Sequence, residues 1–164
     1  MLDKLIPFRP EAAMDQPTSQ LNIVKLMSTV KQFYREWSEE STEKLLYSRL
    51  AQRLKDFMPT GRVLLPGCGL GRSVLEFIKA GYGAQGNEVS YFMLLGSDFI
   101  LNQVTERKSV ELAPFVHCTE GNIDDSMRLS TVLIPDCLAC EDIPADSDFS
   151  MTSGDFLEVY GQQR

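Results

Sequence analysis

The stretch Arg62-Val63-Leu64-Leu65-Pro66-Gly67-Cys68-Gly69-Leu70-Gly71-Arg72 decides the fold of this 164-residue chain. Its apolar start predicts a buried strand of a parallel sheet, and its three glycines predict a tight turn that opens a helix from Arg72 to Ala80. Gly81 ends that helix in the usual C-terminal position. Strand, glycine turn and helix in this order open a doubly wound α/β sheet, in which ligands bind beyond the carboxyl ends of the strands.

Two further strands are predicted downstream. A weaker strand is expected from Tyr82 to Asn87, followed by a helix that begins after Ser90 and runs to about Leu101. A third strand is expected over 148–152, before a helix that begins near Phe156. The stretch 104–148 contains three prolines, and because such long loops are uncommon in compact domains, we expect helical turns within it. The sequence therefore predicts about three parallel strands of a partial Rossmann-like sheet.

Helices are predicted before this sheet. Residues 1–20 carry three prolines and no hydrophobic period, so we expect a flexible arm there. Apolar residues then recur at three- and four-residue spacing, which predicts two helices, the second capped by Ser41 or Thr42. The two apolar stripes consist of Ile23, Val24, Met27, Val30, Tyr34 and Trp37, and of Leu46, Leu50, Leu54 and Phe57. We expect three parts: the arm over 1–20, a helical region over 21–60 and the α/β domain over 61–164.

The glycine turn is the first candidate binding feature. Gly67, Gly69 and Gly71 allow the backbone to approach a ligand closely, and the helix that follows would offer unpaired N–H groups to an anionic group. The nicotinamide fingerprint requires glycine at its sixth position, which is Arg72 in this chain. The spacing G-x-G-x-G is instead familiar from methyltransferases, where the turn lies against the methionine part of S-adenosylmethionine. A glycine-rich turn without a ligand is the alternative.

Acidic residues at two strand ends extend this candidate site. Glu88 closes the second strand about 20 residues after the first glycine, where a carboxylate can accept both hydroxyls of a ribose. Asp155 follows the third strand, where it can accept a hydrogen bond from the exocyclic amine of adenine while Phe156 covers the adenine ring. The alternatives are a solvated acid for Glu88, a helix cap for Asp155 and a core position for Phe156.

Gln32 and Arg35 form a further candidate pair on the first predicted helix. They are three residues apart and share a face that points away from the apolar stripe. They can reach over the cofactor, with Arg35 as the charge partner of its carboxylate. On the pattern alone, a solvated polar face is the alternative.

Composition limits the partners of the chain. The formal net charge is -7 and the pI about 4.7, and because an acidic surface repels phosphate backbones, we expect no nucleic acid partner. No apolar stretch is long enough to span a bilayer, so we expect no membrane partner. The four cysteines, with no signal peptide before them, predict free thiols and a cytoplasmic or nuclear protein. Cys137 and Cys140 form a C-x-x-C pair, but a zinc site needs a second pair or nearby histidines, and His117 is the only histidine, so we expect no metal site.

Four blocks of the sequence, with their order and spacing intact, resemble one enzyme family. The blocks are Ser28–Ser38, Leu65–Arg72, Gly81–Met93 and Phe149–Phe156, and from about Leu26 to Tyr160 the chain resembles carnosine N-methyltransferases. The resemblance implies a class I methyltransferase fold, S-adenosylmethionine as cofactor, and methyl transfer to an imidazole nitrogen of carnosine or a related histidine-containing dipeptide, giving anserine from carnosine. It implies cofactor contacts for Gln32, Arg35, Gly67, Gly69, Gly71, Glu88, Asp155 and Phe156.

The chain departs from the pattern of this family in several places. Cys68 replaces a more usual alanine, and Val89 replaces an expected tryptophan. The carnosine-binding residues of the family would follow Arg164, so we expect an incomplete form without turnover, to which no catalytic residue can be assigned. The sequence leaves the oligomeric state open. It also leaves open two other functions, a non-catalytic cofactor- or protein-binding fragment and a domain of an NAD-type oxidoreductase.

Overall fold

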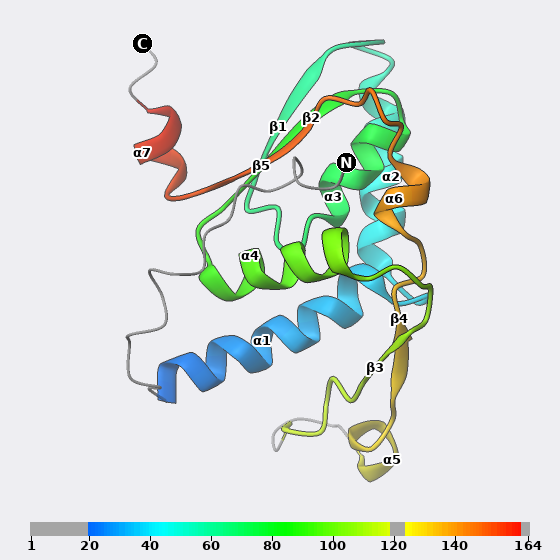
Figure 1. The fold of residues 1–164 in the computed structure, drawn as a ribbon, viewed down its shortest axis with the longest axis vertical. Helices are drawn as coiled ribbons and strands as arrows, with labels where there is room; N and C mark the ends of the chain where they lie inside the picture. The colour runs from blue at the N-terminus through cyan, green and yellow to red at the C-terminus, as the bar shows by residue number, and fades with distance from the viewer. Residues whose placement is uncertain (1–19, 119–123, 162–164) are drawn as a thin grey trace.

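The parallel sheet predicted from the sequence is present in the structure. The computed structural model describes residues 20–118 and 124–161 (Figure 1). Strand β1 (Arg62–Pro66) pairs in parallel with β2 (Gly83–Glu88), which pairs in parallel with β5 (Phe149–Ser153), so the order is β1-β2-β5. The mixed α/β fold is therefore confirmed, and it is consistent with part of a Rossmann-like sheet.

Helices cover this sheet and precede it. They are α1 (Gln20–Trp37), α2 (Thr42–Leu54), α3 (Arg72–Lys79), α4 (Tyr91–Asp98), which continues as the π-helical turn η2 (Phe99–Gln103), and α7 (Phe156–Tyr160). Helix α3 packs against β2 and α2, while α1 lies along α4 (Figure 1). Ser41 caps α2 by accepting a hydrogen bond from the N–H of Lys44 at 3.0 Å, which confirms the predicted start of this helix.

The stretch 104–148 contains an antiparallel ribbon that the sequence pattern did not reveal. Strand β3 (Val110–Leu112) pairs with β4 (Val132–Ile134). Two short helices, α5 (Asp125–Arg128) and α6 (Ala139–Asp142), are the expected helical turns. The ribbon projects from the rest of the molecule, with α5 near its end (Figure 1). Strands of three residues are too short to show an alternating pattern, so sequence periodicity could not identify them.

Helix α3 forms the centre of the core. Seven of its eight residues are buried, and the side chains of Val74 and Leu75 have no exposed surface. Burying an aliphatic side chain of this size contributes about 1.5–3 kcal/mol. The packing of α3 therefore holds the glycine turn, which immediately precedes it, against the carboxyl ends of the strands.

The two predicted helices are present, but their apolar stripes are buried only in part. On α1 the C-terminal Trp37 is fully buried, whereas Ile23 and Val24 are exposed. The second stripe lies largely in solvent, with Leu46, Leu50 and Phe57 all exposed. The buried residues of α2 are instead Glu43 and Ala51. The packing of α2 against α3 and α1 decides which face of the helix is buried, and the hydrophobic pattern alone does not.

Strand β1 is also less buried than expected. Leu64 is 38% exposed, because it points to the opposite face of the sheet from Val63 and Leu65, which pack against the core. Over the same described ranges, no helix combines the length and the apolar character needed to cross a bilayer.

Candidate functional site

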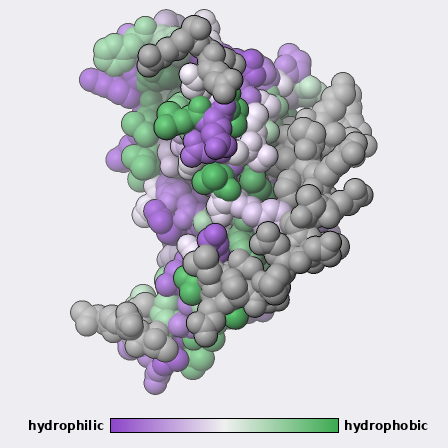
Figure 2. Space-filling model, turned by 90° about the vertical axis from the view of Figure 1, so that its left-hand side faces the viewer, coloured by the Kyte–Doolittle hydropathy of each residue, from purple (hydrophilic) through white to green (hydrophobic). Residues whose placement is uncertain are grey.

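The carboxyl ends of the three parallel strands bring the predicted binding residues to one side of the molecule. In Figure 1 this is the side where α4 begins and where α7 follows β5. The glycine turn follows β1, Glu88 is the last residue of β2, and Asp155 comes two residues after β5. Figure 2 looks onto this side and shows hydrophobic side chains among hydrophilic ones. The predicted location of these residues at strand ends is thus confirmed.

The backbone conformation favours glycine at all three positions of the turn, and lack of space also requires it at Gly71. Gly67, Gly69 and Gly71 have φ values of 66°, 57° and 88°, in the left-handed region that side-chain-bearing residues avoid. A Cβ atom at Gly71 would lie 3.0 Å from Leu101 Cδ1 and 3.3 Å from Met151 Sδ. Any side chain at residue 71 would therefore strain the backbone and push against the core.

Glu88 holds the turn next to β2. Its Oε2 accepts a hydrogen bond from the N–H of Gly69 at 2.9 Å, and its Oε1 accepts from the N–H groups of Val89 and Ser90 at 2.9 and 2.8 Å. A carboxylate has about four lone-pair positions, so three backbone donors leave room for about one more. For Glu88 to accept hydrogen bonds from both hydroxyls of a ribose, one of its three hydrogen bonds from backbone N–H groups must break.

Glu36 completes the turn from α1, and the sequence patterns did not identify it. Its side chain is buried, and its two carboxylate oxygens accept the N–H groups of Leu70 and Arg72, each at 3.0 Å. The expectation that α3 begins with unpaired N–H groups for an anionic ligand was therefore wrong for Arg72, the first residue of the helix. Burial outweighs these hydrogen bonds and raises the pKa of Glu36 to about 7.

Gln32 and Arg35 lie beside Glu36 in one polar network. Gln32 Nε2 donates to Glu36 Oε1 at 2.7 Å and to Glu43 Oε2 at 3.2 Å. The Arg35 guanidinium pairs with Glu43 at 2.6 Å and donates to Gln32 Oε1 at 3.4 Å. The Arg35 side chain is 60% exposed, so it can exchange these partners for a ligand carboxylate at small cost. The alternative of a solvated polar face does not describe Gln32, which lies against the glycine turn.

Asp155 caps α7, as one of the alternatives held. Its Oδ1 accepts the N–H groups of Leu157 and Glu158 at 2.8 and 3.3 Å. Phe156 is 38% exposed, so its alternative as a core residue was wrong. Its ring lies 5.3 Å from that of Tyr160, centroid to centroid. The exposed face of Phe156 is compatible with covering a planar ligand.

Asn87 joins all three strand ends. Its backbone oxygen accepts the N–H groups of Gly67 and Cys68 at 2.8 and 3.2 Å. Its side-chain amide donates to the carbonyl of Gly154 at 3.1 Å, and the N–H of Gly154 in turn donates to the Glu88 carbonyl at 3.1 Å. The glycine turn, Glu88 and the loop of Asp155 are therefore one connected unit, close enough to contact a single small molecule.

Arg72, the residue at the sixth fingerprint position, is a buried structural cation. Its guanidinium donates to both carboxylate oxygens of Asp136, to Glu76 Oε1 at 2.8 Å, and to the backbone oxygen of Glu36 at 3.3 Å. It also lies over the ring of Trp37, 5.2 Å from the centroid. These contacts join the start of α3 to α1 and to the segment after β4.

Two buried cysteines near these contacts, Cys68 and Cys137, have raised pKa values. Burial, assisted by the negative charges of Glu88 and Glu36, raises the pKa of Cys68 to about 12. Burial raises the pKa of Cys137 to about 12, although Arg72 opposes the rise, while Cys140 is exposed. Since the thiolate is the nucleophile, both buried thiols are inert at neutral pH.

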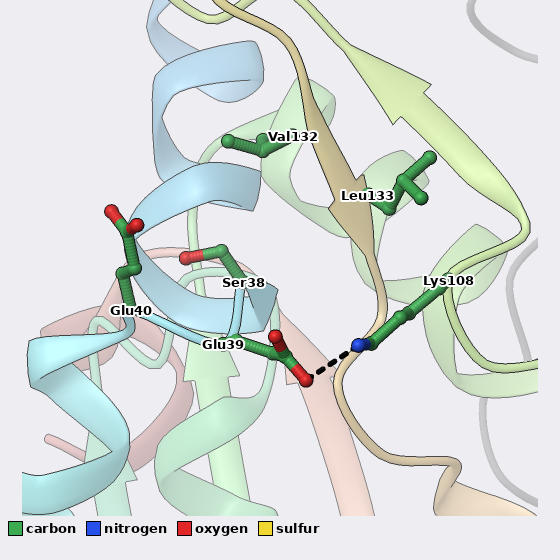
Figure 3. Close-up of a pocket in the computed structure, with 6 residues that line it drawn as sticks. All are labelled: Ser38, Glu39, Glu40, Lys108, Val132 and Leu133. Carbon is green, nitrogen blue, oxygen red and sulfur yellow. Dashed lines mark ion pairs between the residues drawn. The ribbon is translucent and has the colours of Figure 1, made fainter.

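A pocket of about 260 Å³ lies elsewhere, between the α1–α2 connection and the β-ribbon (Figure 3). Its lining residues are Ser38, Glu39, Glu40, Lys108, Val132 and Leu133. The carboxylate of Glu39 and the ammonium of Lys108 form an ion pair at 2.6 Å across it (Figure 3). None of the residues predicted to bind a cofactor lines this pocket, so we place the candidate site at the strand ends.

Comparison with known proteins identifies the family. The sequence model of the family described as carnosine N-methyltransferase matches residues 12–164. The chain belongs to the carnosine N-methyltransferase family.

Relatives from distant organisms agree with this assignment. The chain is 37% identical to the carnosine N-methyltransferase of Mus musculus over 155 residues, which cover 89% of this chain and 38% of the mouse protein. It is 37% identical to that of Schizosaccharomyces pombe over 148 residues, covering 85% of this chain and 40% of the yeast protein. For the Dictyostelium discoideum enzyme, identity is 37% over 147 residues, covering 82% and 32%. The chain thus spans two fifths or less of the length of these relatives.

Proposed function

We propose that this chain is the cofactor-binding part of an S-adenosylmethionine-dependent N-methyltransferase that methylates carnosine on an imidazole nitrogen and gives anserine. The proposal rests on membership of the carnosine N-methyltransferase family. Within that family, the observation that carries it is the connected unit formed by the glycine turn, Glu88 and the loop of Asp155. The α/β domain from residue 61 onward would bind the cofactor. The helical region over 21–60, which contacts the glycine turn through Glu36, would close the site next to that turn.

Each predicted residue has a part in holding the cofactor. Glu88 would bind the ribose, Asp155 would accept a hydrogen bond from the exocyclic amine of adenine, and Phe156 would cover the adenine ring. The glycine turn would lie against the methionine part. Gln32 and Arg35 would reach its carboxylate, because the exposed guanidinium of Arg35 provides a positive charge beside the turn.

The chemistry is a direct displacement. When bound, S-adenosylmethionine supplies a methyl group on a positively charged sulfur, which is the leaving atom. This methyl group would pass to the lone pair of a neutral imidazole nitrogen, the sulfur would keep the electron pair of the broken C–S bond, and the imidazole would release a proton to solvent. The protein mainly holds the two reactants in line, which contributes up to about 7–11 kcal/mol.

A binding and transfer experiment tests this proposal. Calorimetric titration of the protein that contains this chain with S-adenosylmethionine should show binding, and titration with NADH should show none. Incubation with carnosine and methyl-labelled cofactor should transfer label to the dipeptide. Binding of NADH alone would support the oxidoreductase alternative and refute the proposal. Cofactor binding without any transfer to carnosine or related dipeptides would support the non-catalytic alternative.

A further inference from the structure

Glu36 lies at the junction between the helical region and the glycine turn. It belongs to the last turn of α1, and its side chain is almost wholly buried, with 1% of the residue exposed. Burying a carboxylate is unfavourable unless its oxygens receive hydrogen bonds. Glu36 receives three, from the N–H groups of Leu70 and Arg72 and from the Gln32 amide.

Glu36 supplies an acceptor near the start of α3, where no cap side chain does, since Arg72 is the first residue of the helix and Leu70 lies in the turn before it. The residue at the N-cap position of α3 is Gly71, which has no side chain to accept hydrogen bonds from the first turn. Helices usually obtain this acceptor from Ser, Thr, Asp or Asn at the cap. Here Glu36 binds the N–H group of the first helical residue, Arg72, and that of Leu70 in the turn, which are 36 and 34 residues away along the chain.

Gly69 and Glu36 fit each other. A Cβ atom at Gly69 would overlap Glu36 Oε1 and would lie 3.5 Å from Gln32 Nε2. The Glu36 carboxylate therefore occupies the space that a side chain at residue 69 would take. The turn therefore accommodates this carboxylate only with glycine at residue 69.

We propose that Glu36 is a positioning residue of the cofactor site, which holds the glycine turn in its binding shape by capping α3 from α1. The inference rests on the function proposed above for the turn. It also gives Gln32 a second part, since the Gln32 amide holds Glu36 at 2.7 Å. The helical region is then a component of the cofactor site, although it lies outside the parallel sheet.

Loss of this carboxylate should lower cofactor affinity through the shape of the turn. When only a fraction of the molecules has the turn ordered, the apparent dissociation constant rises by the inverse of that fraction. Leaving two buried N–H groups without an acceptor should make the ordered state the minor one, so we expect Glu36→Ala to weaken S-adenosylmethionine binding by about tenfold or more.

The test measures amide exchange and affinity on the same variants of the protein that contains this chain. In Glu36→Ala, hydrogen exchange at the N–H groups of Leu70 and Arg72 should accelerate about tenfold or more. Glu36→Gln keeps one acceptor oxygen and should give intermediate values of both exchange and affinity. The control is Tyr82→Phe, which removes the hydrogen bond from Tyr82 to the Met58 carbonyl at the opposite end of β2. This control should lower stability but leave the exchange at residues 70 and 72 and the affinity unchanged.

The outcomes separate this inference from the proposed function. Unchanged exchange at both amides in Glu36→Ala, or a loss of affinity no larger than that of Tyr82→Phe, overturns the positioning role. If the wild-type protein binds no S-adenosylmethionine, the proposed function fails, and the positioning of a cofactor fails with it. Accelerated exchange in that case would leave Glu36 as a cap of α3 alone.

Discussion

Replacement of Glu36 by glutamine should change how the stability of this protein depends on pH. Burial, which outweighs the hydrogen bonds from Leu70, Gln32 and Arg72, raises the pKa of Glu36 from 4.5 to about 7 in the folded protein, and the negative charge of Glu43 adds to the rise. A difference of one in pKa corresponds to about 1.4 kcal/mol, so the proton on Glu36 is linked to about 3 kcal/mol of folding free energy.

The sign follows from where the proton binds more tightly. Because the folded protein holds this proton better than the unfolded chain does, the contribution of Glu36 to stability is fully present below pH 4.5 and is lost as the pH rises through about 7. Glutamine binds no proton. The free energy of unfolding of Glu36→Gln minus that of the wild type should therefore increase by about 3 kcal/mol between the two ends of this range.

Urea denaturation of both proteins at a series of pH values measures this difference directly. Groups that the Glu36 charge does not reach, such as Asp136, cancel in the difference. Cys68, whose pKa the Glu36 charge raises, titrates near 12 and therefore outside this range. Glu106→Gln is the matched control, since Glu106 is exposed and its neutralisation should leave the difference flat. A difference for Glu36→Gln that stays constant across the range would refute the reasoning, because it would mean that the Glu36 proton does not distinguish the folded from the unfolded state.

Three further substitutions test the rest of the site. Asp136→Asn removes the main carboxylate partner of the Arg72 guanidinium, whose side chain is 0% exposed, and should lower the free energy of unfolding by about 3–5 kcal/mol in urea denaturation. The control is Asp142→Asn, which breaks the partly exposed ion pair with Lys79. A similar cost for both variants would contradict the importance of the buried ion pair. Gly71 has a φ of 88°, and a Cβ atom there would lie 3.0 Å from Leu101 Cδ1, whereas Gly67 has a φ of 66° and open space around it. Gly71→Ala and Gly67→Ala should each lower the free energy of unfolding by at least about 1 kcal/mol, and Gly71→Ala by more. The reverse order would show that the turn is packed differently. Asp155→Asn should keep the cap of α7 and change the free energy of unfolding by less than about 0.5 kcal/mol. The new amide would place a hydrogen-bond donor opposite the adenine amine, which should weaken S-adenosylmethionine binding about tenfold. Unchanged affinity in calorimetric titration would leave Asp155 as a cap alone.

The parallel strands and the residues at their ends could be predicted from local sequence. The apolar run before Gly67, the glycines of the turn and the acids at residues 88 and 155 lie where strand and helix periods begin and end. These signals are local, because backbone sterics and hydrophobic periodicity act over a few neighbouring residues. Parallel strands align their carboxyl ends, so the order of elements was enough to bring these residues to one edge.

The partners of those residues were decided by the tertiary structure. Glu36 reaches Leu70 across 34 residues, and Asp136 reaches Arg72 across 64 residues, so neither contact leaves a periodic mark in the sequence. The same holds for the face of α2 that is buried and for the three-residue strands of the ribbon. In each case the free energy comes from desolvation and hydrogen bonding between segments that meet only after folding. The sequence by itself determined where the glycine turn lies, and the docking of α1 and of the segment after β4 determined which charged side chains hold it.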